Sequence, residues 1–390
     1  MAGKFPKDIS KGNFQQGQCH VENFVDFRCR VQSVVTRAPI RITYTPPERT
    51  ILVTGGAGFV GSAVCRLLAS NGSLRVINLD SLVDSVDAEA LAVPAEQPNY
   101  RFVEGDILDR ALVAGVMAQE AVDGVIHLAA ESRADRAVGD MPPFIDTNVG
   151  GTYQMLEASL EHWRTLLPDA RARFRFHHVS TNAVFGDRSA GSGAVDETAP
   201  YQPTSPVAAV RAAADHLVRA WHASFGLPVV LSHANAGYGP WQKPGKVIPH
   251  AVIAAIEGIS VPIYGAGSEV RDWMHVEDYA RALQAVFFHG QNGQSYSIGG
   301  REEHNNLAVV AIICDLLDRL EPRADGRRRR SLITFLHDRR LADRRHAVDP
   351  SRIERELGWR PEIPFVEGLT EVIDTYHNRA RLALGRAAAG

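Results

Sequence analysis

The sequence lacks the features that mark membrane, disulfide-rich and nucleic-acid-binding proteins. Its four cysteines lie far apart with no CxxC pair, so we expect no metal site and a reducing, cytoplasmic location. Apolar runs such as residues 125–130 are far too short to span a bilayer, so no membrane contact is expected. With 42 Lys and Arg against 45 Asp and Glu, the net charge of −3 gives no electrostatic basis for binding nucleic acid.

The length of 390 residues predicts two or three domains. Residues 1–49 differ from the rest because they are polar and show no sustained periodicity. We interpret them as a partly disordered extension, with a strand near Val31–Thr36 or Arg41–Tyr44.

After residue 49, short apolar runs alternate with helical patterns. The expected strands are Ile51–Val53, Arg75–Leu79, Tyr100–Val103, Val125–Leu128, Phe176–Val179 and Pro228–Leu231. Strands that alternate with helices indicate a doubly wound α/β domain with a parallel sheet covered on both faces, here residues 50–240. The remainder, 241–390, has shorter elements and predicts a smaller C-terminal α/β substrate lobe. Its basic run Arg323–Arg330 is expected to be an exposed, mobile loop.

A glycine-rich turn separates the first strand from the first helix. Gly55, Gly58 and Gly61 have the spacing that brings backbone N–H groups to a pyrophosphate at a helix N-terminus, as in Rossmann-type domains. Asp80 ends the next strand, where a carboxylate binds ribose hydroxyls and repels a 2′-phosphate, which favours NAD over NADP. Asp106 ends the third strand, at the place of an adenine contact. The expected cofactor-binding residues are Gly55, Gly58, Phe59, Val60, Gly61, Asp80, Asp106, Ile107, Ala129, Ala130 and Arg211.

Several strings resemble the extended short-chain dehydrogenase/reductases, and more narrowly the dTDP-glucose 4,6-dehydratases. They include HLAAES at His127–Ser132, FHHVST at Phe176–Thr181, DTNVGGTYQMLEA at Asp146–Ala158 and RDWMHVEDYARAL at Arg271–Leu283. The resemblance covers residues 50–376 and implies NAD-dependent chemistry on a nucleotide-sugar. Hydride leaves carbon 4 of the sugar, water is eliminated across carbons 5 and 6, and the hydride returns to carbon 6.

The sequence departs from this family at the positions that carry the chemistry. The resemblance implies a Tyr-x-x-x-Lys pair and a Thr-Asp-Glu string, with the tyrosine acting as base. Anchored by the flanking strings, Val207 and Arg211 occupy the tyrosine and lysine positions. Thr181 is retained, whereas Asn182 and Ala183 occupy the acid and base positions. Valine, alanine and a carboxamide cannot exchange protons at neutral pH, and arginine stays charged.

Further positions also differ. Arg133 stands at a family histidine, and Ala236 at a family asparagine for which the neighbouring Asn235 could compensate. Tyr201 and His178 are the first residues to consider as substitute bases. The nucleotide-sugar end is better preserved, and the resemblance implies substrate contacts from Lys246, Arg271, Asn306 and Arg345.

Three hypotheses remain. The first is a dehydratase-like protein that binds NAD and a nucleotide-sugar, such as dTDP-glucose or a relative, but lacks ordinary dehydratase activity. The second is a diverged enzyme with different chemistry on a nucleotide-sugar, and the third is a working dTDP-glucose 4,6-dehydratase. The resemblance also implies a homodimer, or a heterodimer with a paralogue, formed through helices at Asp146–Leu160 and Pro206–Ser224.

Overall fold

The computed structural model describes residues 48–83, 88–132, 139–187, 193–337 and 344–389. These residues belong to one unit of the chain, Ile42–Gly390. The strand predicted at Val31–Thr36 or Arg41–Tyr44 lies outside the described residues, as does Arg133.

The main feature of the described residues is a seven-stranded sheet with the order β10-β6-β5-β4-β1-β2-β3, in which every pairing is parallel. The strands are β1 (Arg49–Thr54), β2 (Leu74–Asp80), β3 (Tyr100–Glu104), β4 (Gly124–His127), β5 (Arg175–Thr181), β6 (Val229–Ala234) and β10 (Ser295–Ile298). The predicted doubly wound fold is confirmed. All six strands expected between residues 50 and 240 are present, with ends shifted by a few residues.

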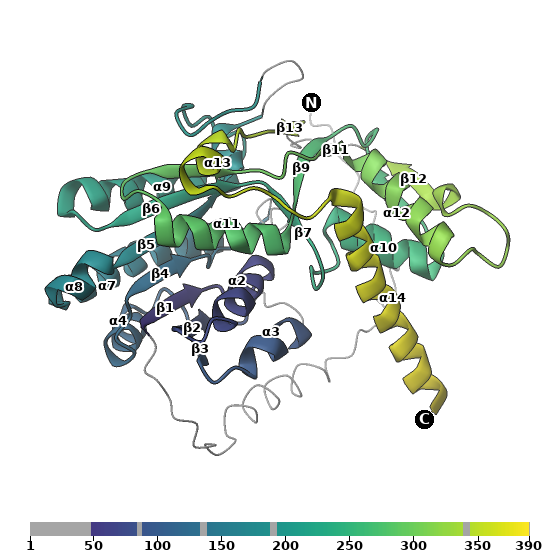
Figure 1. Ribbon diagram of the computed structural model, residues 1–390. Helices are drawn as coiled ribbons and strands as arrows, with labels where there is room; N and C mark the ends of the chain where they lie inside the picture. The colour runs from purple at the N-terminus through teal and green to yellow at the C-terminus, as the bar shows by residue number, and fades with distance from the viewer. Residues whose placement is uncertain (1–47, 84–87, 133–138, 188–192, 338–343, 390) are drawn as a thin grey trace, which may run out of the picture. The chain divides into compact units, whose positions relative to one another are not determined.

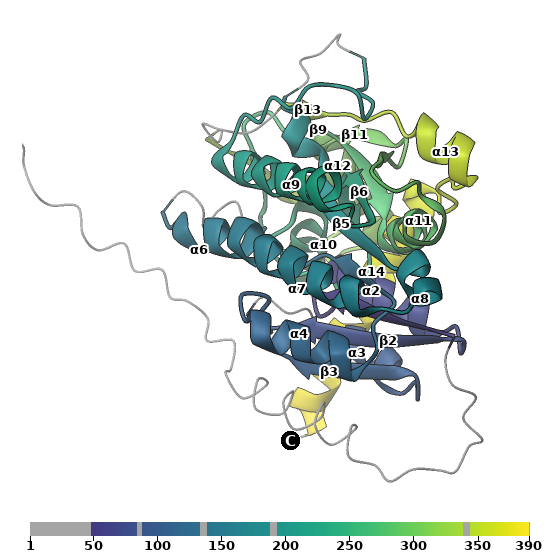
Figure 2. The same ribbon diagram turned by 90° about the vertical axis from the view of Figure 1, so that its left-hand side faces the viewer.

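Helices cover both faces of this sheet. On one face, α2 (Phe59–Ala69) and α11 (Val276–His289) share an apolar core with Ile51 and Val53. On the other face, α4 (Arg110–Gln119), α7 (Thr152–Thr165) and α9 (Pro206–Phe225) pack around Leu52. The alternation along β1 places these side chains on opposite faces, as the two-residue period of a strand requires. Figures 1 and 2 show the two helical layers.

The chain returns to the large sheet after building part of the second lobe. The helix α11 packs on the sheet, and β10 pairs with β6 in parallel register, with Ser295 opposite Leu231 and Ile298 opposite Ala234. Apolar periodicity within residues 241–390 gave no sign that one strand would complete a distant sheet edge. The division of the chain at residue 240 therefore stays a prediction, with β10 and α11 contributing to both sides of it.

The second lobe contains two small sheets. Strands β7 (Ala236–Tyr238), β11 (Glu303–Asn305) and β13 (Arg345–His346) all pair with β9 (Val270–His275), and β8 (Val261–Tyr264) pairs with β12 (Ile333–Leu336). Three helices, α10 (Val247–Glu257), α12 (Asn306–Leu320) and α14 (Phe365–Ala389), share an apolar core with β7, β8, β9 and β12. The shorter elements are α3 (Ala88–Ala95), α6 (Pro142–Ile145), α8 (Pro168–Arg173), η2 (Asn182–Phe185), η3 (Arg329–Leu332) and α13 (Ser351–Leu357). No described helix is long and apolar enough to cross a membrane.

The first helix expected at the dimer interface begins differently from the prediction. Residues Asp146–Gly151 form a π-helical segment, η1, before α7. A Cβ at Gly151 would lie 2.4 Å from Ile107 Cδ1, so a larger residue here would require the Ile107 side chain to shift. The Thr152 hydroxyl donates to the Asn148 carbonyl at 2.6 Å, which stabilises the junction. The second expected helix is α9, which starts at Pro206 as predicted and extends to Phe225.

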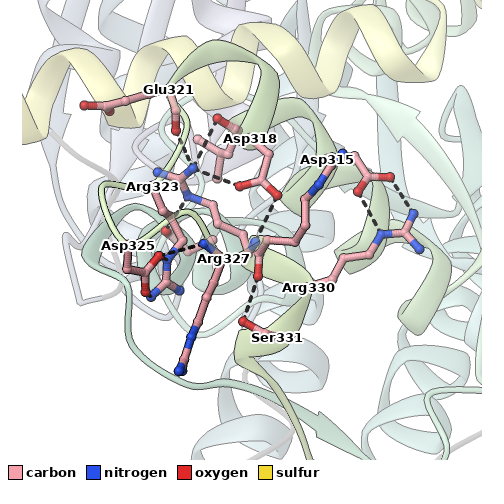
Figure 3. Close-up of polar contacts among 12 residues, drawn as sticks. Asp315, Asp318, Glu321, Arg323, Asp325, Arg327, Arg330 and Ser331 are labelled. Carbon is pink, nitrogen blue, oxygen red and sulfur yellow. Dashed lines mark hydrogen bonds and ion pairs between the residues drawn. The ribbon is translucent and has the colours of Figure 1, made fainter.

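The basic run at residues 323–330 is structured around a buried arginine, so its prediction as an exposed loop is wrong for Arg329. This side chain is 5% exposed and donates from Nε to the Ala255 carbonyl at 3.0 Å and from Nη1 to the Leu317 carbonyl at 3.3 Å. It also pairs with Asp318 at 3.1 Å. Figure 3 shows Asp318 beside the exposed Arg330–Asp315 ion pair. Arg329 thus satisfies carbonyls at the C-terminal ends of α10 and α12.

Candidate functional site

The turn after β1 packs so closely against its neighbours that glycine is required at two of its positions. Gly55 has φ +73°, and a Cβ there would lie 2.6 Å from Ala129 N. A Cβ at Gly61 would lie 2.1 Å from the Gly55 carbonyl oxygen, so α2 can start here only with a glycine. Gly58 is the N-cap residue of α2, and no side chain caps this helix end. The first N–H groups of α2 are therefore left for a ligand, and their chemistry suits a phosphate.

Asp80 supports this turn from the end of β2. Its Oδ2 accepts a hydrogen bond from Ala57 N at 2.9 Å, and its Oδ1 accepts one from Leu82 N at 2.8 Å. Each carboxylate oxygen has a second lone pair, so these bonds still allow Asp80 to accept from a ribose hydroxyl. The structure thus places the predicted carboxylate directly beside the glycine turn.

The other expected cofactor residues follow the neighbouring strands. Ala129 and Ala130 come after β4 and are half-buried, with Ala129 N donating to Thr54 Oγ1 at 3.4 Å. Asp106 is exposed beyond β3 and accepts from Leu108 N at 2.9 Å, whereas Ile107 is buried. Phe59 and Val60 are half-buried in the first turn of α2. All of them lie at the carboxyl ends of parallel strands, where ligands bind in open α/β sheets.

Thr181 and Asn182 lie at the carboxyl end of β5 and begin a chain of hydrogen bonds. The Thr181 hydroxyl donates to Asn182 Oδ1 at 3.4 Å, and the Asn182 amide donates in turn to Asn235 Oδ1. Ala183 contributes only its backbone N–H, which donates to Thr181 Oγ1 at 3.3 Å. Asn182 is 7% exposed, so its carboxamide is held by protein contacts.

The chain of hydrogen bonds continues to a carboxylate on β9, in the four-stranded sheet. Asn235 Nδ2 donates to Asp272 Oδ2 at 2.5 Å, and Gly300 N and Glu302 N also donate to Asp272, at 3.0 and 2.8 Å. Burial raises the pKa of Asp272 to about 6, although its three hydrogen bonds oppose this shift. Sequence reasoning did not single out Asp272 itself, because its link to β5 runs between two different sheets.

Val207 and Arg211 lie one turn apart on α9. Val207 is half-buried in the first turn, whereas Arg211 is 8% exposed and donates to the Val179 carbonyl on β5. Burial lowers the pKa of Arg211, and Asp215 acts in the opposite direction. Arginine remains a cation even so, and Arg211 holds α9 against β5.

The two candidate substitute bases are bound to one buried carboxylate. Asp215 accepts from the hydroxyls of Ser180 at 2.9 Å and Tyr201 at 2.8 Å. The Nε2 atoms of His178 and His233 lie 3.2 and 3.1 Å from its oxygens. Burial would raise the pKa of Asp215, but the adjacent rings of His178 and His233 hold it well below its usual value.

This cluster limits what Tyr201 and His178 can do chemically. Burial and Asp215 raise the pKa of Tyr201, so its hydroxyl keeps its proton at neutral pH. Burial lowers the pKa of His178, against the effect of Asp215. The sequence carried no signal for the cluster, because Asp215 and His233 looked like ordinary helix and strand residues.

Three of the four expected substrate residues lie on or next to the four-stranded sheet around β9: Arg271 is on β9, Arg345 is on β13, and Asn306 begins α12 directly after β11. Arg271 and Asn306 both contact Glu269, at 3.7 and 2.9 Å, and Arg345 forms a two-pronged ion pair with Glu303. Arg345 and Arg271 lie on the paired strands β13 and β9. Among the described residues no contact joins Lys246 to these three; it is exposed and precedes α10. Within the residues that the structure describes, no three His, Cys, Asp or Glu side chains are grouped to hold a metal ion.

Comparisons with known proteins agree with this architecture. The family model described as GDP-mannose 4,6 dehydratase matches residues 52–372. The dTDP-glucose 4,6-dehydratase of Neisseria gonorrhoeae is 46% identical over 334 residues, which is 85% of this chain and 96% of that protein.

Solved structures give the same result. The dTDP-glucose 4,6-dehydratase of Bacillus anthracis, solved in complex with NAD, has a TM-score of 0.75 and 34% identity over 85% of this chain and 98% of that one. The dTDP-glucose 4,6-dehydratase of Streptomyces venezuelae, also solved with NAD, has a TM-score of 0.76 and 36% identity over 84% of this chain and 97% of that one. The chain therefore belongs to the GDP-mannose 4,6 dehydratase family of extended short-chain dehydrogenase/reductases and is similar to dTDP-glucose 4,6-dehydratases.

Proposed function

We propose that this chain binds NAD and a nucleotide-sugar, dTDP-glucose or a relative, and lacks ordinary dehydratase turnover. The observation that carries the proposal is the set of residues around the end of β5 and the start of α9. Thr181, Asn182, Val207 and Arg211 provide no group that can take or give a proton near neutral pH. General acid–base catalysis contributes about 10²–10⁴-fold for each group, so its loss makes turnover slow.

The cofactor part of the proposal rests on the fit of the glycine turn. The uncapped N–H groups of α2 would hold the pyrophosphate, and Asp80 would accept hydrogen bonds from the adenosine ribose. NAD, when bound, supplies a hydride acceptor. Arg211 keeps a positive charge behind β5, and Thr181 offers a hydroxyl at the carboxyl end of the sheet.

The substrate part rests on the cluster of Arg271, Asn306 and Arg345. Arg271 and Arg345 bring two cations to paired strands, and a diphosphate would compete with Glu269 and Glu303 for them. Asn306 Oδ1 is buried without a hydrogen-bond partner among the described atoms, so it is an acceptor available for a nucleotide group. Lys246 would join this site only if the ligand reaches the start of α10.

A working dTDP-glucose 4,6-dehydratase is the second candidate, and the relatives named above favour it. Purified protein incubated with dTDP-glucose and NAD separates the two, because the 4-keto product absorbs in alkali. We expect binding of both ligands by calorimetry and no product. Turnover near the median enzyme rate of ~10 per second would contradict the proposal.

Restoring the missing groups tests the cause. Val207→Tyr with Arg211→Lys should allow the first oxidation, seen as NADH absorbance when the sugar is present, and adding Asn182→Asp and Ala183→Glu should permit water loss. Val207→Phe with Arg211→Lys is the matched control, since it adds the ring without the hydroxyl. An equal gain in the control would show that a proton acceptor at residue 207 is not what the protein lacks.

We also propose a cytoplasmic dimer, with a second copy or a dehydratase paralogue as partner. Large apolar side chains are exposed near α7 and α9: Ile145 is 49%, Tyr153 39% and Phe225 45% exposed. Trp221 contacts both Tyr153 and Phe225 edge to face, which joins them into one patch. Sedimentation at micromolar concentration tests this, and a monomer alone or mixed with a paralogue would contradict it.

A further inference from the structure

The hydrogen-bond chain from Thr181 to Asp272 has a direction. An ionised carboxylate can only accept hydrogen bonds, so Asp272 requires Asn235 to present its amide Nδ2. Asn235 then turns Oδ1 toward Asn182, which must present its own Nδ2. Asn182 Oδ1 is thereby left facing Thr181.

We propose that Asp272 is a positioning residue that, through Asn235, turns the Thr181–Asn182 edge of the site into a hydrogen-bond acceptor. Such an edge binds a ligand group that donates a hydrogen bond, such as a sugar hydroxyl, and disfavours a carbonyl, which can only accept one. This inference deepens the proposed function and rests on it for the identity of the ligand.

The surroundings of Asp272 keep this arrangement in place. Asp272 is 4% exposed, and a Cβ at Gly299 would lie 2.7 Å from its Oδ2. Asn235 is 7% exposed, so water does not compete freely for its carboxamide. A wrongly oriented carboxamide here would leave buried polar atoms without a partner, which is unfavourable because they have already lost their hydrogen bonds to water.

The last link of the chain is the weakest. At 3.4 Å, the Thr181 hydroxyl lies farther from Asn182 Oδ1 than in a well-formed O–H···O bond. Ala183 N already donates to one lone pair of Thr181 Oγ1 at 3.3 Å, which also favours turning the hydroxyl proton toward Asn182. The remaining lone pair of Thr181 and the Asn182 oxygen can then accept a hydrogen bond from a ligand hydroxyl.

Charged groups around Asp272 affect its ionisation. Glu303 lies opposite Asp272 on β11 and raises its pKa, although burial is the larger cause. Glu303 is itself paired with Arg345 of β13. The exposed Arg301, in the loop before β11, is bound to Glu354. Arg271, which precedes Asp272 on β9, contacts Glu269. None of these side chains is shown bonded to the Asp272 carboxylate.

The test compares two ligands on the full-length protein by calorimetry: dTDP-glucose, with a hydroxyl on carbon 4, and the 4-keto-6-deoxy dTDP-sugar. The ratio of their affinities is the readout. Asp272→Asn should lower the preference for the hydroxyl about fivefold, the size expected for one hydrogen bond. Asn182→Ala interrupts the series of hydrogen bonds nearer the ligand and leaves the bonds from backbone N–H groups to Asp272 in place. It should therefore decrease the preference for the hydroxyl by a similar factor. The double variant should match Asn182→Ala alone, because both changes act through the same carboxamide.

Asp278→Asn is the matched control. Asp278 is also a fully buried carboxylate that accepts from two backbone N–H groups, those of Glu362 and Ile363, but it has no bond to Asn235. We expect this variant to lose stability with an unchanged affinity ratio. The inference is overturned if Asp272→Asn leaves the ratio unchanged or weakens both ligands by the same factor.

A ligand-free measurement separates this inference from the proposed function. In protein labelled with ¹⁵N-asparagine, the side-chain signals of Asn235 and Asn182 should shift together with a midpoint near pH 6, following Asp272. Both shifts should vanish in Asp272→Asn. If neither sugar nucleotide binds but the signals titrate, the proposed function fails and the positioning role stands. If the signals do not titrate, the positioning role is wrong.

Discussion

Replacing Arg329 by methionine should destabilise the protein far more than replacing either neighbouring arginine. The change removes the donors to the Ala255 and Leu317 carbonyls and leaves the 6%-exposed Asp318 side chain without its cation. Breaking one side of a buried ion pair costs about 3–5 kcal/mol, and this pair has those carbonyl bonds in addition. We therefore expect the free energy of unfolding to fall by about 4 kcal/mol.

Two matched controls lie next to Arg329 in the sequence. Arg330 pairs with Asp315 on the surface, where the side chains are 55% and 38% exposed, so Arg330→Met should cost at most about 1 kcal/mol. Arg328 is exposed, and Arg328→Met should change stability by less than about 0.5 kcal/mol.

Urea unfolding followed by tryptophan fluorescence measures all three variants, with an unchanged m-value as the condition for comparing midpoints. Adding Asp318→Leu to Arg329→Met should recover part of the loss, because the unpaired buried carboxylate is gone. If Arg329→Met costs no more than Arg330→Met, the assignment of Arg329 as the buried cap of α10 and α12 is refuted.

Three further predictions concern the cofactor turn and Asp272. Gly61→Ala should abolish NAD binding, measured by calorimetry, because its Cβ would lie 2.1 Å from the Gly55 carbonyl oxygen; retained affinity would contradict the role of the turn. Asp80→Ala should narrow the preference for NAD over NADP, and equal affinity of the unaltered protein for both cofactors would already refute the role of this carboxylate. Burial raises the pKa of Asp272 from 3.8 to about 6, so between these values the folded state binds more protons than the unfolded state. Stability from this group therefore falls by about 3 kcal/mol as the pH rises through that window, and Asp272→Asn should remove this part of the slope in urea unfolding at pH 4.5–6.5.

The parts of the fold that could be predicted from sequence are those specified by neighbouring residues. The strand at Ile51–Val53, the glycine turn and the helix after it follow each other directly, so their pattern is legible in one short segment. The partnership of β10 with β6 depends on residues far apart in the chain, and no local pattern encodes it. The π-helical start at Asp146–Gly151 was also missed.

The same distinction applies to the site. Residue types at single positions, such as Val207 and Asn182, can be read from sequence, and they carry the proposal of missing acid–base groups. Their partners cannot, because Asn235 and Asp272 meet Asn182 only after two sheets have formed. Arg329 was misjudged because arginine is usually exposed, and its burial depends on carbonyls from two different helices.

The late return of the chain to its largest sheet has a consequence for synthesis on the ribosome. Strand β6 can pair on its second side only after β10 has been synthesised. The ribosome makes β7, α10, β8, β9 and α11 after β6 and before β10. During that interval the edge of β6 that pairs with β10 is unpaired, and Val230, which packs with side chains of α11 and β10, lacks part of its native cover. Unpaired strand edges promote association with other chains. Nascent chains stalled before Ser295 should therefore bind chaperones and aggregate more readily than chains released after Ile298.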